Sequence, residues 1–382
     1  MELKVALSIE SIGREQWNAV AGEANPFLRY EFLAALERHG CVGAQHGWTP
    51  RHLIALDRNA RLIGAVPLYL KDNSYGEFVF DWAWADAYQR QGLQYYPKSV
   101  VGIPYTPATG PRILVHPEVD RLPVAAALSQ LALDWSRSEN LSSLHWLFTD
   151  ESDTRLLSDQ GLLLRLGCQF HWRNQGYRDF DDYLSGFNSR KRKKVRRERR
   201  FVHDQNIEIR VIHGHEADDF QLRTMHDFYR TTFEKKWGYP TLTEAFFRDI
   251  AANMGEQLVF FIAYKNLSIV AGAICLRSEN TLYGRHWGCF EDYNSLHFEA
   301  CYYQGIDYCI RHGLHSFEPG AQGEHKVSRG FLPTPTWSAH WIAHEGFRGV
   351  IGRHLQQETL AMRDYMEELA GHSPFKDGGE DV

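Results

Sequence analysis

A glycine-rich stretch late in the chain, Phe317–Phe331, combines backbone donors and cations that could bind a negatively charged group. Gly320 and Gly323 allow backbone N–H groups to point into a shared concavity. The stretch also carries charged or titratable side chains, among them Glu318, His325, Lys326 and Arg329. Such donors and cations stabilise the oxyanion of a tetrahedral intermediate, or bind the phosphates of an acyl donor. The alternative interpretation is an ordinary turn with solvated charges.

A second candidate is the predicted strand Tyr283–Cys289. Alternate residues of a strand share a face, so Arg285 and Trp287 lie together. Glycines between them allow a ligand to approach the backbone. The alternative is a central strand whose glycines accommodate a packed helix. We take Arg285 and Trp287 as the candidate substrate-binding residues of this strand.

The predicted helix Leu296–His312 begins with His297 and Glu299. A histidine titrates near neutral pH, so His297 is a candidate general base. Glu299 and Tyr303 are candidate substrate-binding residues, because the start of a helix also attracts anions. The alternative is ordinary capping chemistry, in which a glutamate in the first turn is favourable.

Two aromatic residues, Trp237 and Tyr239, flank Gly238 just before Pro240. This sequence predicts a rigid loop that either lines a substrate groove or only ends the preceding helix.

Residues 190–200 hold nine basic residues and one acid, in a chain whose net charge is −6. Three interpretations remain open: an RNA-binding helix, a helix on an anionic membrane surface, and a solvated linker between domains. Too few apolar residues accompany the charges for insertion into a bilayer, so we expect at most peripheral membrane contact. The candidate contacts to an anion or to transfer RNA are Arg190, Lys191, Lys193, Arg196 and Arg200.

Composition excludes several classes of protein. The 382 residues are 43% hydrophobic and 24% charged, which excludes disordered, collagen-like and coiled-coil chains. The six cysteines include no CxxC pair, and the histidine pairs lack the other ligands of a zinc site, so we expect no metal. Nucleotide-binding glycine motifs are absent, as are signal-peptide and membrane-spanning patterns. These patterns predict a cytoplasmic protein; they say nothing of its oligomeric state.

An internal repeat organises the elements that must position these residues. A gapless offset of 208 residues aligns 53–80 with 261–288, each predicted as a strand, a turn, a second strand, and a third strand from Tyr75 or Thr281. Flanking segments extend the order to β-α-α-β-β-β-α-β in both halves. The fold class is therefore α/β, with a mixed sheet present twice. The predicted boundaries are a domain over 1–165, a linker with the basic helix over 166–205, a second domain over 206–370 and a tail over 371–382.

This order resembles that of the GNAT superfamily, the acyl-CoA N-acyltransferases, and a tandem pair resembles the Fem-type aminoacyl transferases of cell-wall synthesis. Longer motifs are similar to the FemAB-like family, labelled peptidoglycan biosynthesis or recognition proteins. They are Asn25-Pro-Phe-Leu28, Gly102–Arg112, Tyr283–Gly288, Leu296–Gln304 and Glu318–Lys326 with Arg329–Pro333.

The resemblance implies an activity and roles for particular residues. Lys326 matches the lysine that contacts the reaction centre in Fem-type enzymes, which tend to have Phe where this chain has His325 and Asp where it has Glu318. The implied reaction is attack of an amine on an activated acyl group. The implied co-substrate is acyl-CoA or aminoacyl-tRNA, with no bound cofactor, and the implied acceptor is a small molecule or a cell-wall precursor. A non-catalytic module that recognises such a precursor or RNA is the alternative.

Overall fold

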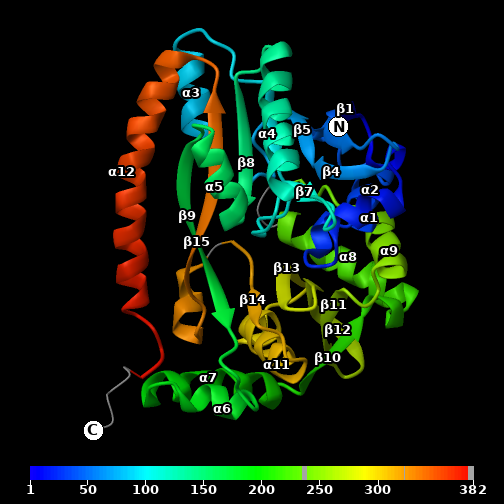
Figure 1. The fold of residues 1–382 in the computed structure, drawn as a ribbon. Coiled ribbons are helices and arrows are strands. Elements are labelled where there is room, and N and C mark those ends of the chain that lie inside the picture. The colour runs from blue at the N-terminus through cyan, green and yellow to red at the C-terminus, as the bar shows by residue number, and fades with distance from the viewer. Residues whose placement is uncertain (235–238, 322, 377–382) are drawn as a thin grey trace. The chain divides into compact units, whose positions relative to one another are not determined.

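The computed structural model describes residues 1–234, 239–321 and 323–376. Two compact units make up the chain (Figure 1). Unit 1 comprises Met1–Cys168 and Pro335–Asp364, and unit 2 comprises Gln169–Thr334 and Tyr365–Val382. Both units are therefore discontinuous in sequence.

The units differ from the predicted domains of 1–165 and 206–370 in one main respect. Strand β15 (Leu332–Ile342) pairs antiparallel with β8 (Ser143–Thr149), with Trp337 opposite Thr149 and Ile342 opposite Ser143. The backbone hydrogen bonds of this pair assign Pro335–Asp364 to unit 1, together with most of the long helix α12 (Glu345–Ala370).

Unit 1 contains two sheets, ordered β1-β3-β4-β7 and β15-β8-β6-β5-β2. Neighbouring strands run antiparallel except β6 and β8, which are parallel. The elements are β1 (Glu2–Ala6), α1 (Arg14–Ala21), α2 (Tyr30–Arg38), β2 (Thr49–Pro50), β3 (His52–Leu56), β4 (Leu62–Val66), β5 (Leu68–Lys71), α3 (Trp82–Arg90), β6 (Lys98–Val101), β7 (Leu114–Val115), α4 (Arg121–Ser138), β8 and α5 (Glu151–Asp159).

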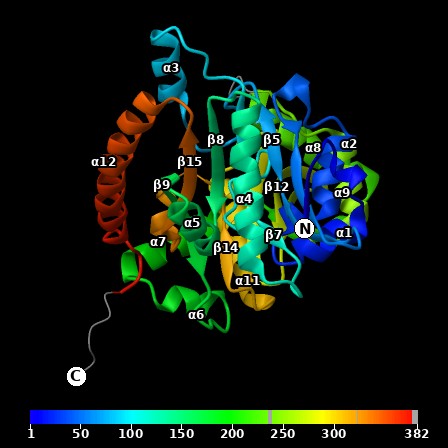
Figure 2. The ribbon, with the colours of Figure 1, turned by 45° about the horizontal axis from the view of Figure 1, so that its top comes forward.

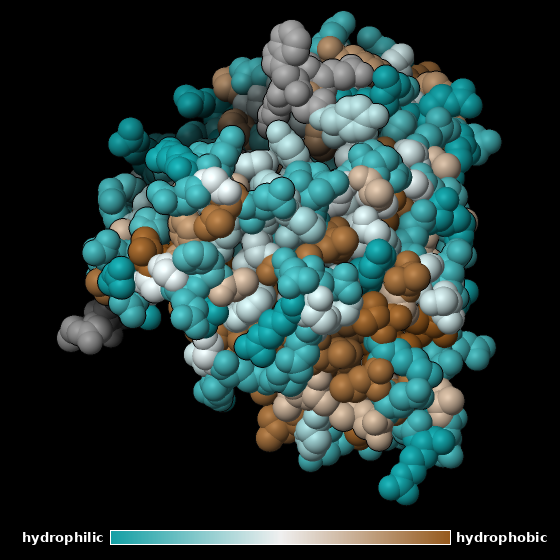
Figure 3. Space-filling model, turned by 90° about the horizontal axis from the view of Figure 1, so that it is seen from above, coloured by the Kyte–Doolittle hydropathy of each residue, from teal (hydrophilic) through white to brown (hydrophobic). Residues whose placement is uncertain are grey.

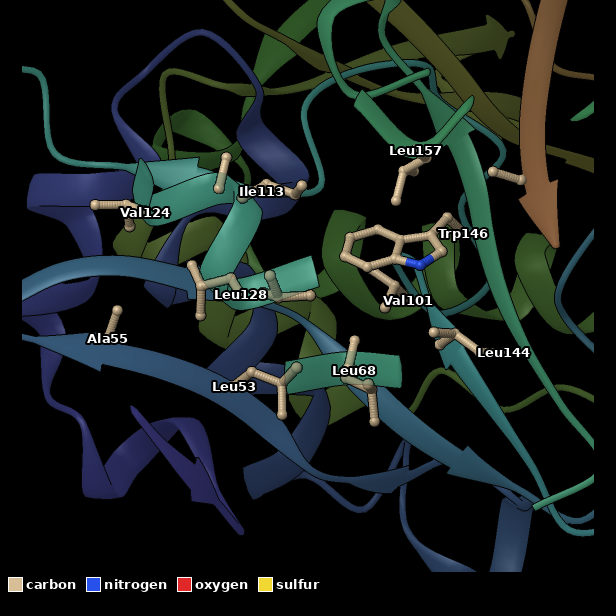
Figure 4. Packing of buried hydrophobic residues seen from close by; sticks show 14 of the residues in the cluster. Leu53, Ala55, Leu68, Val101, Ile113, Val124, Leu128, Leu144, Trp146 and Leu157 are labelled. Carbon is tan, nitrogen blue, oxygen red and sulfur yellow. The ribbon is translucent and has the colours of Figure 1, made fainter. Parts of the chain in front are cut away.

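A buried apolar cluster joins α4 to both sheets of unit 1 (Figure 4). Trp146 of β8 lies at its centre, with Leu128 of α4 and Leu53 of β3 among its neighbours. The helix α4 runs along the strands, as Figure 2 shows. Burial of this apolar surface is the main stabilising contribution to the unit.

The strand predicted from Tyr75 is wrong. Strand β5 ends at Lys71, and residues 72–97 form a long connection that contains α3 before β6 begins. Tyr75-Gly76 therefore lies in a loop, whereas its repeat partner Tyr283-Gly284 lies in a strand. The aligned pairs at 54–55 and 64–65 do fall in matching strands of the two units.

Unit 2 is built on a sheet ordered β10-β11-β12-β13-β14-β9, in which only β13 and β14 pair in parallel. Its elements are β9 (Leu163–Arg173), α6 (Phe180–Ser185), α7 (Ser189–Asp204), β10 (Ile207–His213), α8 (Asp219–Glu234), α9 (Glu244–Asn253), β11 (Leu258–Lys265), β12 (Ser268–Arg277), β13 (Thr281–Cys289), α10 (Leu296–Phe298), α11 (Gln304–Arg311) and β14 (Ser316–Glu318). The first residues of β9 belong to unit 1.

The predicted helix Leu296–His312 is present but not regular. Between α10 and α11 the backbone forms a π-helical turn over Glu299–Tyr303. Such turns insert an extra residue into a helix and frequently occur at functional sites.

Candidate active site in unit 2

The strands β13 and β14 diverge after a short parallel pairing. Thr281 pairs with Ser316 and Tyr283 with Glu318, where β14 ends, while β13 continues to Cys289. The register of β13 against β12 also shifts at this point, with Arg285 as the extra residue. A bulge of this kind redirects side chains and ends regular pairing. The second half of β13 and the turn after β14 therefore frame the candidate site.

The glycines of β13 have identifiable packing roles. A Cβ atom at Gly288 would lie 2.0 Å from the backbone oxygen of Phe228 in α8, and one at Gly284 would lie 3.2 Å from Cα of Pro319. The first contact is helix packing, the simpler alternative raised by the sequence. The second brings the turn after β14 against β13.

Lys326 is buried beneath this turn, with 2% of its surface exposed. Its Nζ donates a hydrogen bond of 2.7 Å to the carbonyl oxygen of Gly320, which has the left-handed φ of 93° that glycine accommodates. Burial lowers the pKa of Lys326 to about 8, so the ammonium form still predominates at pH 7. An ammonium has three N–H donors and can bind a further oxygen.

His325, the neighbour of Lys326, belongs to an aromatic cluster around His297. The ring centroid of His297 lies 5.5 Å from Trp287, 5.4 Å from Tyr302 and 6.4 Å from His325. Tyr302 and His325 are joined by a hydrogen bond of 2.9 Å between the hydroxyl and Nε2. Three residues proposed from sequence thus meet here, together with Tyr302.

The imidazole of His325 is neutral at physiological pH. Partial burial lowers its pKa, and the nearby charges of Arg329 and Lys326 lower it further. A neutral imidazole that is exposed to solvent can accept a proton, as a general base must.

Glu318 is the last residue of β14 and directly precedes the glycine-rich turn. Its Oε2 is 4.0 Å from Nε2 of His171 on β9, and its charge opposes the fall in the pKa of Arg285. Burial lowers the pKa of Arg285 to about 10 and that of His171 to about 3. The structure therefore places Glu318, Arg285 and a neutral His171 in one electrostatic group.

Arg329 and Tyr303 face the basic helix. Arg329 Nη2 donates to Glu198 of α7 at 2.9 and 3.0 Å, and its Nε donates to the Tyr303 hydroxyl at 3.0 Å. That hydroxyl donates in turn to Glu198. Glu299 pairs with Arg199 of α7 at 3.1 Å. These three candidates hold α7 against the π-helical turn.

A groove of about 520 Å³ opens beside His325 within unit 2. Its lining combines the first turn of α7, the turn Glu324–Arg329, the end of α12 and the segment after it: Lys191, Glu324, His325, Val327, Ser328, Leu369, Gly371, His372 and Ser373. The basic helix therefore contributes directly to the space next to the candidate base.

The side chains that line the outer face of α7 are charged and solvent-facing. Arg190, Lys193, Arg196 and Arg200 are exposed, and Lys191 is partly exposed. The buried residues of the helix are Val195, Glu198 and Val202. Asn188 caps the helix by accepting a hydrogen bond of 3.0 Å from the Lys191 amide.

The structure describes only part of the loop proposed at 237–239. Tyr239 is 75% exposed, and Trp237 lies outside the described residues.

Sequence reasoning missed His171 and Glu198 and gave Tyr302 no role. His171 lies in β9 without any motif around it, so no local signal identified it. Glu198 was visible as the one acid in the basic run, and its isolation there was the available signal.

No helix among the described residues has the length and apolarity that a bilayer crossing requires. In the same part of the chain, no group of three or more His, Cys, Asp or Glu side chains could hold a metal ion.

Comparison with known proteins identifies both family and fold. The family model FemAB_like, described as peptidoglycan biosynthesis/recognition, matches residues 8–377. The chain matches no curated protein.

Solved structures share the fold at low sequence identity. The crystal structure of FemX has a TM-score of 0.54 and 11% identity, over 92% of this chain and 100% of FemX. The structure of L-PGS from Bacillus licheniformis has a TM-score of 0.51 and 10% identity, over 87% of this chain and 98% of L-PGS. A conserved protein of unknown function from Bacteroides thetaiotaomicron has a TM-score of 0.52 and 10% identity, over 89% of this chain and 99% of that protein. The predicted α/β fold class with mixed sheets is confirmed, and the chain shares its fold with FemX.

Proposed function

Because this chain belongs to the FemAB-like family of peptidoglycan biosynthesis/recognition proteins, we propose that unit 2 is an N-acyltransferase. In the proposed reaction an acceptor amine attacks the carbonyl carbon of an activated ester or thioester. A C–N bond forms, the C–O or C–S bond of the donor breaks, and the proton lost by the amine reaches the leaving oxygen or sulfur. The observation that carries the proposal is the buried Lys326 ammonium beside a neutral His325.

Lys326 stabilises the oxyanion in this proposal. The negative charge develops on the carbonyl oxygen during the attack, and a cation already fixed in a site of low water content stabilises it without reorganisation. The hydrogen bond to Gly320 O fixes the ammonium, and the remaining N–H donors serve the oxyanion.

His325 acts as the general base in the same proposal. The lowered pKa keeps its imidazole neutral, and the contact with Tyr302 orients the ring. The groove beside His325 accommodates the acceptor amine. The ring of His297 lies beside the imidazole, and Trp287 packs against His297.

We further propose aminoacyl-tRNA as the donor and a peptidoglycan precursor as the acceptor. The exposed cations of α7 form a track that reaches the groove through Lys191, and a polyanion matches such a track better than a single phosphate cluster does. Acyl-CoA is the alternative donor. A non-catalytic module that binds a precursor or RNA through the same groove is the alternative function.

The test offers the purified protein a peptidoglycan-precursor peptide with a free amine, together with either aminoacyl-tRNA or acyl-CoA. Mass spectrometry should detect the precursor carrying one aminoacyl group, formed only with aminoacyl-tRNA. A product formed only with acyl-CoA would identify acyl-CoA as the donor in place of aminoacyl-tRNA. Binding of the precursor or of tRNA without any product would favour the recognition module.

A further inference from the structure

Residues 74–82 of unit 1 bury their charges and expose their aromatic rings. Glu77 and Asp81 are 3% and 2% exposed, whereas Tyr75 and Phe80 are 70% and 54% exposed. Phe78 and Trp82 are exposed as well. A surface loop ordinarily has the opposite arrangement, because charged side chains favour water and aromatic side chains favour the core. We call residues 75–82 the aromatic loop.

Buried ion pairs hold the aromatic loop in this orientation. Lys98 of β6 donates to Glu77 at 2.8 Å and to Asp81 at 2.5 Å. The Tyr95 hydroxyl adds a bond of 2.5 Å to Asp81. A carboxylate paired in this way cannot leave for solvent without stranding a buried lysine. The loop is therefore anchored with its carboxylates inward.

The loop backbone is fixed at a second point. Lys71 Nζ and Trp48 Nε1 both donate to the carbonyl oxygen of Tyr75, each at 3.1 Å. Phe78 adopts a left-handed φ of 60°, which a bulky residue rarely does. The surroundings thus impose a conformation that displays the aromatic side chains.

The surface that residues 74–94 themselves expose is almost uncharged, and Arg165, which donates to the carbonyl oxygen of Phe80 at 2.7 Å, is paired with Glu358. From residue 74 to residue 94 the exposed charged residues are Asp86 and Arg90, one turn apart on α3 and of opposite sign. Leu93 adds an exposed apolar side chain, and Gln89, Gln91 and Gln94 are the polar neighbours. Figure 3 views the molecule from the end at which α3 stands in Figure 1, and hydrophobic surface appears there among hydrophilic surface.

We propose that the aromatic loop is a membrane-surface element, which inserts Phe78, Phe80 and Trp82 among the head groups of a lipid bilayer. Tyr and Trp favour the membrane–water interface because their rings are amphipathic, and binding grows with the apolar area buried there. Withdrawal of both carboxylates removes their repulsion from lipid phosphates. Asp86 and Arg90 are of opposite sign, so residues 74–94 present no net exposed charge to an acidic or basic protein partner.

The proposed surface is distinct from the basic helix α7 in its chemistry. Cationic side chains bind anionic lipids and lose that binding as salt increases. An uncharged aromatic loop should bind zwitterionic lipids and tolerate salt. This proposal does not depend on the acyltransferase activity.

The experiment is flotation of the full-length protein with phosphatidylcholine vesicles at low and high salt. We expect the wild type to float under both conditions. The F78S/F80S/W82S variant should bind at least about tenfold more weakly, because each aromatic ring contributes buried apolar area. The matched control F220S/L267S/L360S removes three other exposed apolar side chains and should float as the wild type does.

Fluorescence quenching locates the contact. Brominated lipids should quench wild-type emission more than that of the conservative W82F variant, since Trp82 is the tryptophan placed in the bilayer. Equal quenching of the two proteins, failure of the wild type to float, or equal loss of binding in the control variant would each overturn the proposal. Near-ultraviolet circular dichroism verifies that every variant is folded.

Discussion

The buried ammonium of Lys326 is the residue on which the proposed chemistry depends most. Lys326→Met keeps the length and apolar stem of the side chain but removes the charge. We expect turnover to fall by about 10²–10³, since one preformed oxyanion partner is worth that much. Single-turnover assays measure the loss. Lys265→Met, in β11, is the matched control and should leave turnover unchanged. Full activity in Lys326→Met would remove this residue from the mechanism.

The same substitution has a signature in stability. The pKa of Lys326 is about 8 in the fold against 10.5 as its ordinary value, so the unfolded chain binds more protons between these pH values. Below pH 8 the buried charge of Lys326 lowers the free energy of unfolding. That free energy increases as pH rises from 8 toward 10.5, because Lys326 loses its proton in the folded protein first. The Lys326→Met variant should lack this gain. Urea unfolding at several alkaline pH values tests the difference.

A lowered His325 pKa predicts the acid limb of the pH–rate profile. The imidazole, near Arg329 and Lys326 and bonded to Tyr302, must lose its proton to act as a base. The limb of kcat/KM should therefore lie below pH 6.5, the ordinary histidine value. His325→Gln should lower the rate by about 10²–10⁴ and abolish that limb. An unchanged limb in His325→Gln would assign it to another group.

At the scale of the element, α7 carries two functions on two faces. The inner face is held by the Glu198–Arg329 pair, and the outer face presents cations. Replacing Lys191, Lys193, Arg196 and Arg200 by Gln should weaken tRNA binding and flatten its dependence on salt, because fewer counterions are released. Thermal stability should change little, since exposed ion pairs such as Arg196–Asp181 contribute little. Filter binding across a salt series measures the slope.

The contrasting change on α7 is Glu198→Ala. It leaves the Arg329 guanidinium buried without its carboxylate, which costs about 3–5 kcal/mol in comparable buried pairs. The denaturation midpoint should fall far more than in the four-Gln variant. If the four-Gln variant were the less stable of the two, α7 would be an electrostatic brace and not a donor track.

The sequence predicted most elements because their signals are local. Strands β11 and β12, for example, are apolar runs joined at the short turn after Lys265, where the sequence predicts a turn. The cap of α9 shows the limit: Thr241 lies three residues before Glu244, which is the spacing of a capping box, yet Thr243 accepts the hydrogen bond from the Phe246 amide. Both threonines precede a glutamate, and only the tertiary path of the loop selects between them.

The site was less predictable than the elements, for physical reasons. The proximity of His297 to His325, whose ring centroids lie 6.4 Å apart, could not be read from their spacing in the sequence. The π-helical turn that contains Tyr302 has no characteristic composition, and its contacts with α7 join residues about 100 positions apart in the sequence. His171 reaches Glu318 through strand pairing between β9 and β14, a long-range contact without a local signal.

At the scale of the whole molecule, the two-unit division predicts how fragments behave. Residues 1–168 include most of unit 1 but lack β15, which pairs with β8 along six residues of each strand or more. Without β15, β8 becomes an open edge, and the fragment should be unstable or aggregate. A fragment in which a linker joins residues 335–364 to the end of residues 1–168 should show a cooperative unfolding transition. Circular dichroism with denaturant compares the two, and a stable 1–168 fragment would contradict the expectation.

The late position of β15 in the chain also affects synthesis. A ribosome completes β8 at residue 149 and must add nearly two hundred further residues before β15 is made. At about 5–20 residues per second, that interval lasts on the order of ten to forty seconds. During it, the nascent protein presents an unpaired strand edge to the cell. We therefore expect chaperones that bind the nascent chain during this interval to increase the yield of folded protein.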